Sequence, residues 1–170
     1  DMTPSEVANA VTYQMGALLA FMSDKKLQHL KPHGAMYNKA VRDPAQAAAI
    51  VRAGLDFDPS MIQLLLAGSR WEKIARDAGA RVARECFADR AVTPDGALAP
   101  RSQPNSVLHD INEVIDRSLR LVIEGRVTAV DGTDIDFVAD SICLHGDNPG
   151  AVELAVALRQ AFEKEGLQIR

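Results

Sequence analysis

Cysteine is scarce in this chain of 170 residues, with Cys86 and Cys143 as its two members. Each lies in an apolar stretch, the two do not form a C-x-x-C pair, and no secretory signal precedes them. This pattern predicts reduced core thiols in a cytoplasmic protein. No apolar run approaches the roughly 18 residues that a membrane span needs. We therefore expect a soluble protein.

An excess of positive charge is also absent. The chain has 19 Lys and Arg against 23 Asp and Glu, a formal net charge of -4 and a pI of about 5.5. Nucleic acids and anionic membranes attract basic surfaces, so this balance gives neither of them a footprint. The predicted partner is a small molecule or another protein.

Several catalytic and nucleotide-binding motifs are missing as well. The sequence contains no G-x-x-x-x-G-K-[ST], no G-x-G-x-x-G and no G-x-S-x-G. These absences exclude a P-loop and a dinucleotide fingerprint, and they weaken the case for a serine hydrolase. There is no compact H-x-x-x-H spacing, and we assign no metal ligand.

The order of predicted elements indicates the fold class. Helices are predicted from Pro4 onward and at 44–53, 70–78, 110–124 and 149–165, and strands at 27–31, 61–67, 81–87, 141–144 and 167–169. Strands that alternate with helices predict an α/β fold with a mostly parallel sheet, either open or curved into a barrel. A hairpin is expected around Asp131-Gly132 and a long loop over 88–107. The length suits one domain over residues 1–170.

Three polar clusters directly follow predicted strands. They are Lys31–Asn38, Glu85–Arg90 and Cys143–Pro149. In α/β folds, ligands bind beyond the carboxyl ends of the strands. We therefore expect the three clusters to form one site.

Each cluster also has a structural interpretation. After the strand at 141–144, helical amides could hold an anion while His145 or Asp147 handles protons, or Asp147 or Asn148 could simply cap a helix. Lys31 and His33 favour function over a solvated Lys and a packed His, because Tyr37 and Asn38 add further polar groups.

The remaining polar residues divide in the same way. Glu85, Asp89 and Arg90 form either a catalytic network or a structural ion pair. Arg101 either clamps a substrate carboxylate or phosphate, or is an ordinary surface arginine. His29, His109 and Trp71 are assigned to structure.

The clusters together resemble the signature blocks of the LamB/YcsF family. The similar segments are Lys31–Asn38, Phe87–Arg90, Asp95-Gly96 with Pro100-Arg101, and Cys143–Pro149, with Tyr13–Leu18 ahead of them. They occur in the family's order over essentially the whole chain. The resemblance implies a deformed (β/α) barrel of the glycoside hydrolase and deacetylase type.

The resemblance also implies an activity. Members form the A subunit of 5-oxoprolinase, which opens 5-oxo-L-proline to L-glutamate with ATP hydrolysis, ATP being bound as a co-substrate with Mg, together with the B and C subunits. Because this chain has no P-loop, we expect the partners to supply most of the phosphorylation. For this chemistry we assign catalytic roles to Lys31, His33, Glu85 and Asp147. Substrate-binding roles fall to Tyr37, Asn38, Asp89, Arg90, Arg101, His145 and Asn148.

The chain departs from the family pattern in two respects. Family members begin with an Asp-Leu-Asn-Cys-Asp-like strand and an Ala-Cys-Gly-Phe-His-Ala-Gly-Asp-like block, and neither is present. We therefore expect the C-terminal two thirds of the barrel, without its N-terminal strands. Asn105-Ser106 stands where the family usually has Gly-Ala, and Ala91-Val92 where an aromatic residue is common. Two alternatives remain: a divalent-metal-dependent amide or N-acetyl hydrolase on the same fold, and a non-catalytic 5-oxoproline-binding subunit.

Overall fold

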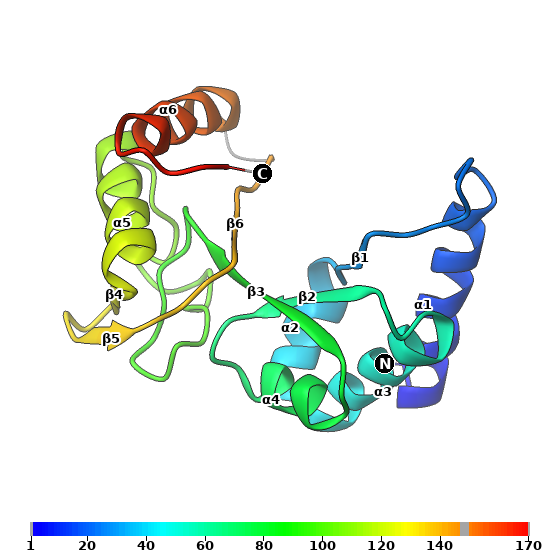
Figure 1. Ribbon diagram of the computed structural model, residues 1–170. Coiled ribbons are helices and arrows are strands. Elements are labelled where there is room, and N and C mark those ends of the chain that lie inside the picture. The colour runs from blue at the N-terminus through cyan, green and yellow to red at the C-terminus, as the bar shows by residue number, and fades with distance from the viewer. Residues whose placement is uncertain (1, 147–149, 170) are drawn as a thin grey trace. The chain divides into compact units, whose positions relative to one another are not determined.

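Two compact units make up the chain, residues 1–84 and residues 85–170, and strand β3 (Arg81–Phe87) runs from the first into the second (Figure 1). The computed structural model describes residues 2–146 and 150–169. Each unit is considered by itself. The prediction of one domain over residues 1–170 stays a prediction.

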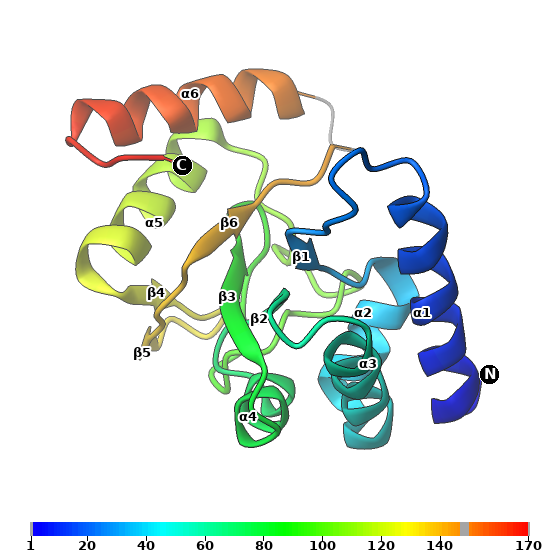
Figure 2. The same cartoon turned by 45° about the vertical axis from the view of Figure 1, so that its right-hand side comes forward.

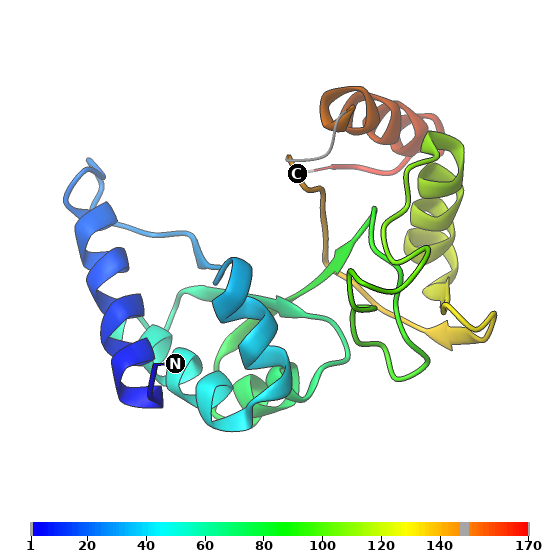
Figure 3. The same ribbon diagram turned by 180° about the vertical axis from the view of Figure 1, so that it is seen from behind.

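Four helices form most of unit 1: α1 (Pro4–Leu19), α2 (Gly34–Arg42), α3 (Pro44–Phe57) and α4 (Arg70–Asp77). Helix α3 contacts the other three, and Figure 3 shows α1 in dark blue beside it. Helix α1 begins with the predicted capping box. The Thr3 hydroxyl accepts a hydrogen bond from the Glu6 amide at 3.3 Å, and the Glu6 carboxylate accepts one from the Thr3 amide at 2.7 Å. These bonds satisfy amides that a helix start otherwise leaves without partners.

The strands of unit 1 are β1 (His29–Leu30), β2 (Ile62–Leu66) and the first part of β3. Strands β1 and β2 are parallel, with His29 opposite Ile62. The apolar run that predicted β2 is largely buried, as expected for a strand covered on both faces.

Helix α2 is an element that the sequence did not predict. Pro32 and Gly34 made its start resemble a turn, and Gly34 does adopt a positive φ of 60°. The helix begins at that glycine and buries Tyr37 and Ala40, three residues apart on one face. A turn signal and a helix start therefore coincide within four residues.

Unit 2 contains the rest of β3 and strand β6 (Ser141–Cys143), which lie side by side in Figure 2. They pair in parallel, with Glu85 opposite Ser141 and Phe87 opposite Cys143. The strand order of the whole sheet is β1-β2-β3-β6. The predicted α/β class with a parallel sheet is confirmed.

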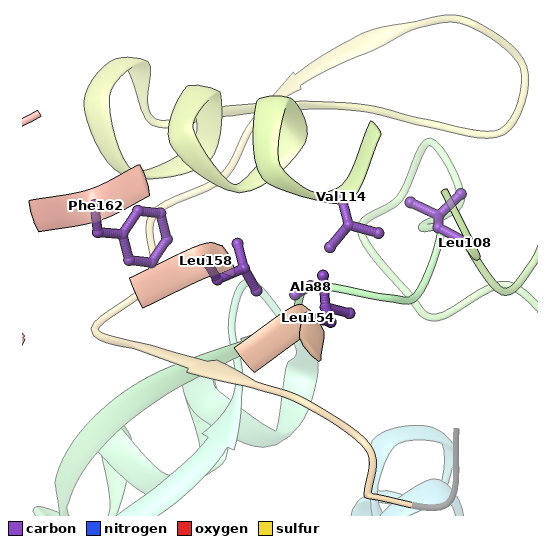
Figure 4. Close-up of a cluster of buried hydrophobic side chains, with 6 residues drawn as sticks. All are labelled: Ala88, Leu108, Val114, Leu154, Leu158 and Phe162. Carbon is purple, nitrogen blue, oxygen red and sulfur yellow. The ribbon is translucent and has the colours of Figure 1, made fainter. Parts of the chain in front are cut away.

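Helices α5 (Ile111–Glu124) and α6 (Ala151–Lys164) pack together in unit 2. Figure 4 shows their shared core, in which Leu154, Leu158 and Phe162 of α6 gather near Val114 of α5 and Ala88. Leu108 also belongs to this cluster of buried residues. The core of unit 2 therefore lies close to the residues that follow β3.

A hairpin and the chain end complete unit 2. Strands β4 (Arg126–Thr128) and β5 (Asp134–Asp136) form the predicted antiparallel hairpin, as a two-stranded sheet of their own. The strand predicted at 167–169 was wrong, because Leu167 instead continues from the end of α6, where its amide donates to the Phe162 carbonyl at 2.9 Å and its side chain packs on the core. The predicted start of α6 at Pro149 lies outside the described residues.

Candidate functional site

The first polar cluster lies between β1 and α2 in unit 1. Lys31 is half-buried, and His33 is exposed as the residue that precedes α2, without a side-chain bond to the helix. Asn38 is exposed on the helix. The imidazole and amide groups therefore face solvent in unit 1.

Tyr37, on the same helix, is turned into the core of unit 1. It is 4% exposed, and its ring meets Trp71 edge-on with centroids 5.3 Å apart. Trp71 is fully buried, which confirms its assignment to packing. Tyr37 thus has a packing role besides the substrate-binding role predicted for it.

The second and third clusters meet in unit 2. Asp89 follows β3, His145 follows β6, and the parallel register brings the carboxyl ends of these neighbouring strands together. The Nδ1 atom of His145 lies 2.9 Å from Oδ1 and 3.1 Å from Oδ2 of Asp89. These two clusters therefore converge as the strand order predicts, whereas the first cluster belongs to unit 1. Asp147 and Asn148 lie outside the described residues.

Phe87 completes the surroundings of His145. The two rings stack with centroids 5.2 Å apart and an interplanar angle of 12°. The carboxylate thus fixes one edge of the imidazole and the phenyl ring covers one face. The sequence analysis missed Phe87, although its place two residues before Asp89, at the end of the strand, was a usable signal.

Glu85 lies on β3 two residues before Phe87 and points to the same face of the strand. It is 1% exposed. Its catalytic role stays a prediction.

Arg90 braces the long loop that follows β3. It is 6% exposed, its Nε donates to the Ser106 carbonyl at 3.2 Å, and its Nη2 donates to the Ala99 carbonyl at 2.6 Å. Burial lowers the pKa of Arg90, and the nearby charge of Arg101 lowers it further, whereas Asp89 raises it. This structural role was not expected from the sequence, and the predicted role of Arg90 in substrate binding stays a prediction.

Arg101 is exposed on the same loop, and its effect on Arg90 places the two guanidinium groups in one neighbourhood. An exposed guanidinium can pair with a carboxylate or phosphate through two hydrogen bonds. Its predicted role in substrate binding therefore keeps a physical basis.

Arg117, on α5, is a further cation that the sequence analysis missed. Its Nη1 donates to the Phe87 carbonyl at 3.3 Å. Burial lowers the pKa of Arg117, and the charge of Asp89 is among the effects that raise it. The contact spans 30 positions of the chain, so no local pattern could have predicted it.

The cysteines agree with their predicted state. Both are free; Cys86 is buried and Cys143 is half-buried. Burial raises the pKa of Cys86 to about 12. The Cys86 thiol therefore stays protonated near neutral pH and packs as a small apolar group.

Cavities and clusters of metal-ligand type were sought across the described residues. One groove of about 700 Å³ is lined by α5, β4 and the long loop, and another of about 570 Å³ by α5, α6 and the segment after α6. Neither lining includes a predicted site residue. Within 2–146 and 150–169, no three His, Cys, Asp or Glu side chains form a group that could hold a metal ion. In the same ranges, no helix is long and apolar enough to cross a membrane.

The sequence profile of the LamB/YcsF family matches residues 1–170. The chain belongs to the LamB/YcsF family. The solved structure of a lactam utilization protein from Thermus thermophilus, at 45% identity, superposes with a TM-score of 0.92 over 99% of this chain and 68% of that one. This neighbour agrees with the deformed barrel that the sequence predicted.

Curated LamB/YcsF relatives carry a common name. The A subunit of 5-oxoprolinase from Pyrococcus furiosus is 47% identical over 99% of this chain and 67% of its own length. The corresponding A subunit from Syntrophobacter fumaroxidans is 49% identical over 98% of this chain and 66% of its own length. The chain thus spans about two thirds of the length of these relatives.

One departure from the LamB/YcsF pattern has a clear backbone explanation. Asn105, which stands where the family usually has Gly, adopts a positive φ of 60°. Glycine reaches this conformation freely, and Asn tolerates it better than most residues do. The loop can therefore keep the backbone conformation that a glycine would allow.

Proposed function

We propose that this chain is the A subunit of a 5-oxoprolinase, a hydrolase that opens the cyclic amide of 5-oxo-L-proline to give L-glutamate. The observation that carries the proposal is 47–49% identity, over 98–99% of the chain, to proteins that bear the name of this A subunit. The solved neighbour, named a lactam utilization protein, agrees, because 5-oxoproline is a five-membered lactam.

The name of these relatives, which designates one lettered component of an enzyme, places such a protein in a multi-subunit complex. We take the partners to be the B and C subunits, and ATP, with Mg, to be used by the complex. Phosphorylation of the lactam carbonyl oxygen would turn that oxygen into a leaving group, which a stabilised amide needs before water can attack. The absence of a P-loop in this chain supports a phosphorylation step that depends largely on the partners.

The polar clusters supply the remaining chemistry. Lys31 and Arg101 would stabilise the phosphate and the developing oxyanion, with Arg90 beside them, and His33, Glu85 or Asp147 would move protons. The exposed amide of Asn38 is suited to bind the substrate carboxylate. Tyr37, Asp89, His145 and Asn148 are the other proposed substrate-binding residues.

Alanine substitutions in the natural complex test these roles. Lys31→Ala, His33→Ala and Asp147→Ala should each lower the rate of ATP-dependent glutamate formation by roughly a hundredfold or more, because each removes a charge or a proton carrier that acts on the reacting atoms. Thermal unfolding should change little for His33, since the side chain is exposed and lacks a capping bond.

His29→Ala is the matched control for His33→Ala. His29 is also an exposed imidazole of unit 1, four positions earlier, where its Nδ1 lies 3.1 Å from Gln28. Its loss should leave turnover near the wild-type rate. Near-normal turnover of all three site variants would overturn the site assignment.

A further inference from the structure

We propose that His145 is the proton-transfer residue of this site and that Asp89 is a positioning residue that holds it, rather than a ligand of the substrate. The inference rests on the proposed function for the identity of the substrate. The paired geometry on which it depends is a property of unit 2 alone.

Three contacts fix the imidazole of His145. Both carboxylate oxygens of Asp89 lie within 3.1 Å of Nδ1, and Phe87 stacks on one face of the ring. Backbone pairing continues past the strand ends, where the Ala88 amide donates to the Cys143 carbonyl at 3.0 Å. The two side chains are thus carried by adjacent, hydrogen-bonded segments, which limits their relative motion.

This arrangement selects one form of the neutral imidazole. A carboxylate accepts hydrogen bonds, so Nδ1 carries the proton and donates it to Asp89. The Nε2 atom is then left with a lone pair that can accept a proton. The side chain of His145 is 19% exposed, so the ring is partly open to solvent.

Asp89 is poorly placed to bind a substrate directly. Its side chain is 3% exposed, and both of its oxygens face Nδ1. The guanidinium groups of Arg90 and Arg117 lie close enough for the charge of Asp89 to raise their pKa values. The carboxylate is therefore enclosed by the protein's own cationic and imidazole groups.

The proton balance of the hydrolytic step follows from these positions. Nε2 of His145 accepts a proton as the oxygen of water bonds to the lactam carbonyl carbon. The bond between that carbon and the ring nitrogen then breaks, and the nitrogen receives the proton that Nε2 holds. One water and one lactam give one open-chain amino acid, and His145 returns to its starting form.

Kinetics of the natural complex test the roles of both residues. His145→Ala should lower kcat by roughly a hundredfold or more while KM changes little, because general acid–base catalysis contributes about that factor. Added imidazole should restore part of the lost rate. Asp89→Asn should lower kcat by roughly tenfold or more with little change in KM, because an amide can hold the ring in the wrong tautomer.

Matched exchanges in the same unit are the controls. His109→Ala removes an exposed imidazole just before α5, and Asp116→Asn neutralises an exposed carboxylate on α5. Both should leave kcat near the wild-type value. An Asp89→Asn variant in which KM rises and kcat is kept would make Asp89 a substrate ligand and overturn its positioning role. Loss of activity in His145→Ala without rescue by imidazole would overturn the proton-transfer role.

Nitrogen-15 NMR of the imidazole separates this inference from the proposed function. A protonated Nδ1 and an unprotonated Nε2 in His145, lost in Asp89→Asn, are expected whichever substrate the complex uses. The opposite tautomer would contradict the inference even in a complex that forms glutamate. A wild-type complex that forms no glutamate would refute the proposed substrate, while the tautomer would still decide whether Asp89 positions His145.

Discussion

At the scale of single residues, buried charge decides how the loop after β3 is held. Arg90 connects the start of that loop to two carbonyls farther along it, those of Ala99 and Ser106. The backbone adds two more bonds in the same region, from the Leu108 amide to the Asp89 carbonyl and from the Ala91 amide to the Ser106 carbonyl. The loop is therefore ordered by polar contacts around one guanidinium.

Arg90→Ala should destabilise the protein strongly. The change removes a charged donor from two buried carbonyls, and bonds to charged groups contribute about 1.5–3 kcal/mol each, so we expect a loss of about 3 kcal/mol or more in the free energy of unfolding. Urea denaturation measures it. Arg101→Ala, on the same loop but exposed, is the control and should change stability by less than about 0.5 kcal/mol. Equal stability of the two variants would show that Arg90 does not brace the loop.

Residue types at this scale were readable from the sequence, but their partners were not. The pattern Phe-Ala-Asp-Arg after a strand correctly marked a polar site. That Asp89 faces His145, 56 positions away, followed only from parallel pairing of β3 and β6. That Arg90 turns to backbone carbonyls of its own loop depended on a loop conformation that no periodicity specifies.

At the scale of elements, α3 and β2 approach closely at a glycine. A Cβ atom on Gly54 would lie 2.6 Å from Nε2 of Gln63 and 3.1 Å from Cδ2 of Leu30. Gln63 is 1% exposed and donates to the Val51 carbonyl at 3.0 Å, so its amide cannot move without losing a buried bond. Gly54 is thus required by packing, although glycine disfavours a helix interior.

Gly54→Ala should therefore destabilise the protein by about 1–3 kcal/mol, because overpacking outweighs the helix propensity gained. Gly16→Ala in α1 is the matched control, since no atom lies within 4 Å of the added Cβ. That change should stabilise the protein by roughly 0.5–1 kcal/mol. Thermal or urea unfolding measures both, and stabilisation by both changes would contradict the close approach.

The hairpin is tied to α5 by a pair whose strength depends on pH. Arg120 donates to both carboxylate oxygens of Asp134 on β5 and to Glu124 on its own helix. Hydrogen bonds from Arg120, and then from Thr128, hold the pKa of Asp134 well below its ordinary value of 3.8. A lowered pKa means that the folded state favours the carboxylate, so this stabilisation is complete above the ordinary pKa and is lost as pH falls below it.

Asp134→Asn should accordingly lower stability near neutral pH and flatten its decline in acid. Urea midpoints of wild type and variant should differ most at about pH 5 and converge toward about pH 2, below the ordinary range for Asp. A difference that stays constant over this range would show that the pair does not titrate as described.

Element prediction succeeded where local signals agreed. Helices α1 and α5 and strand β3 were found close to their observed bounds, because capping residues, glycine stops and apolar runs all pointed the same way. Helix α2 was missed because Pro32 and Gly34 signal a turn within the same segment. A strand was wrongly predicted at 167–169, because an apolar pattern of three residues cannot distinguish a strand from a tail packed on a core.

At the scale of the whole molecule, function rests on the family and on assembly. Membership of the LamB/YcsF family accounts for polar clusters at several strand ends, and the lack of a P-loop accounts for a dependence on partners. Neither composition nor periodicity named a lactam as the substrate. That information came from the particular residues of the signature blocks.

The most direct test of the account is ATP-dependent formation of L-glutamate from 5-oxo-L-proline by the natural complex, measured with and without this chain. We predict glutamate formation and ATP hydrolysis together when the chain is present, and no glutamate when it is left out. Full glutamate formation by the partners without this chain, or none by the complete complex, would contradict the proposed function.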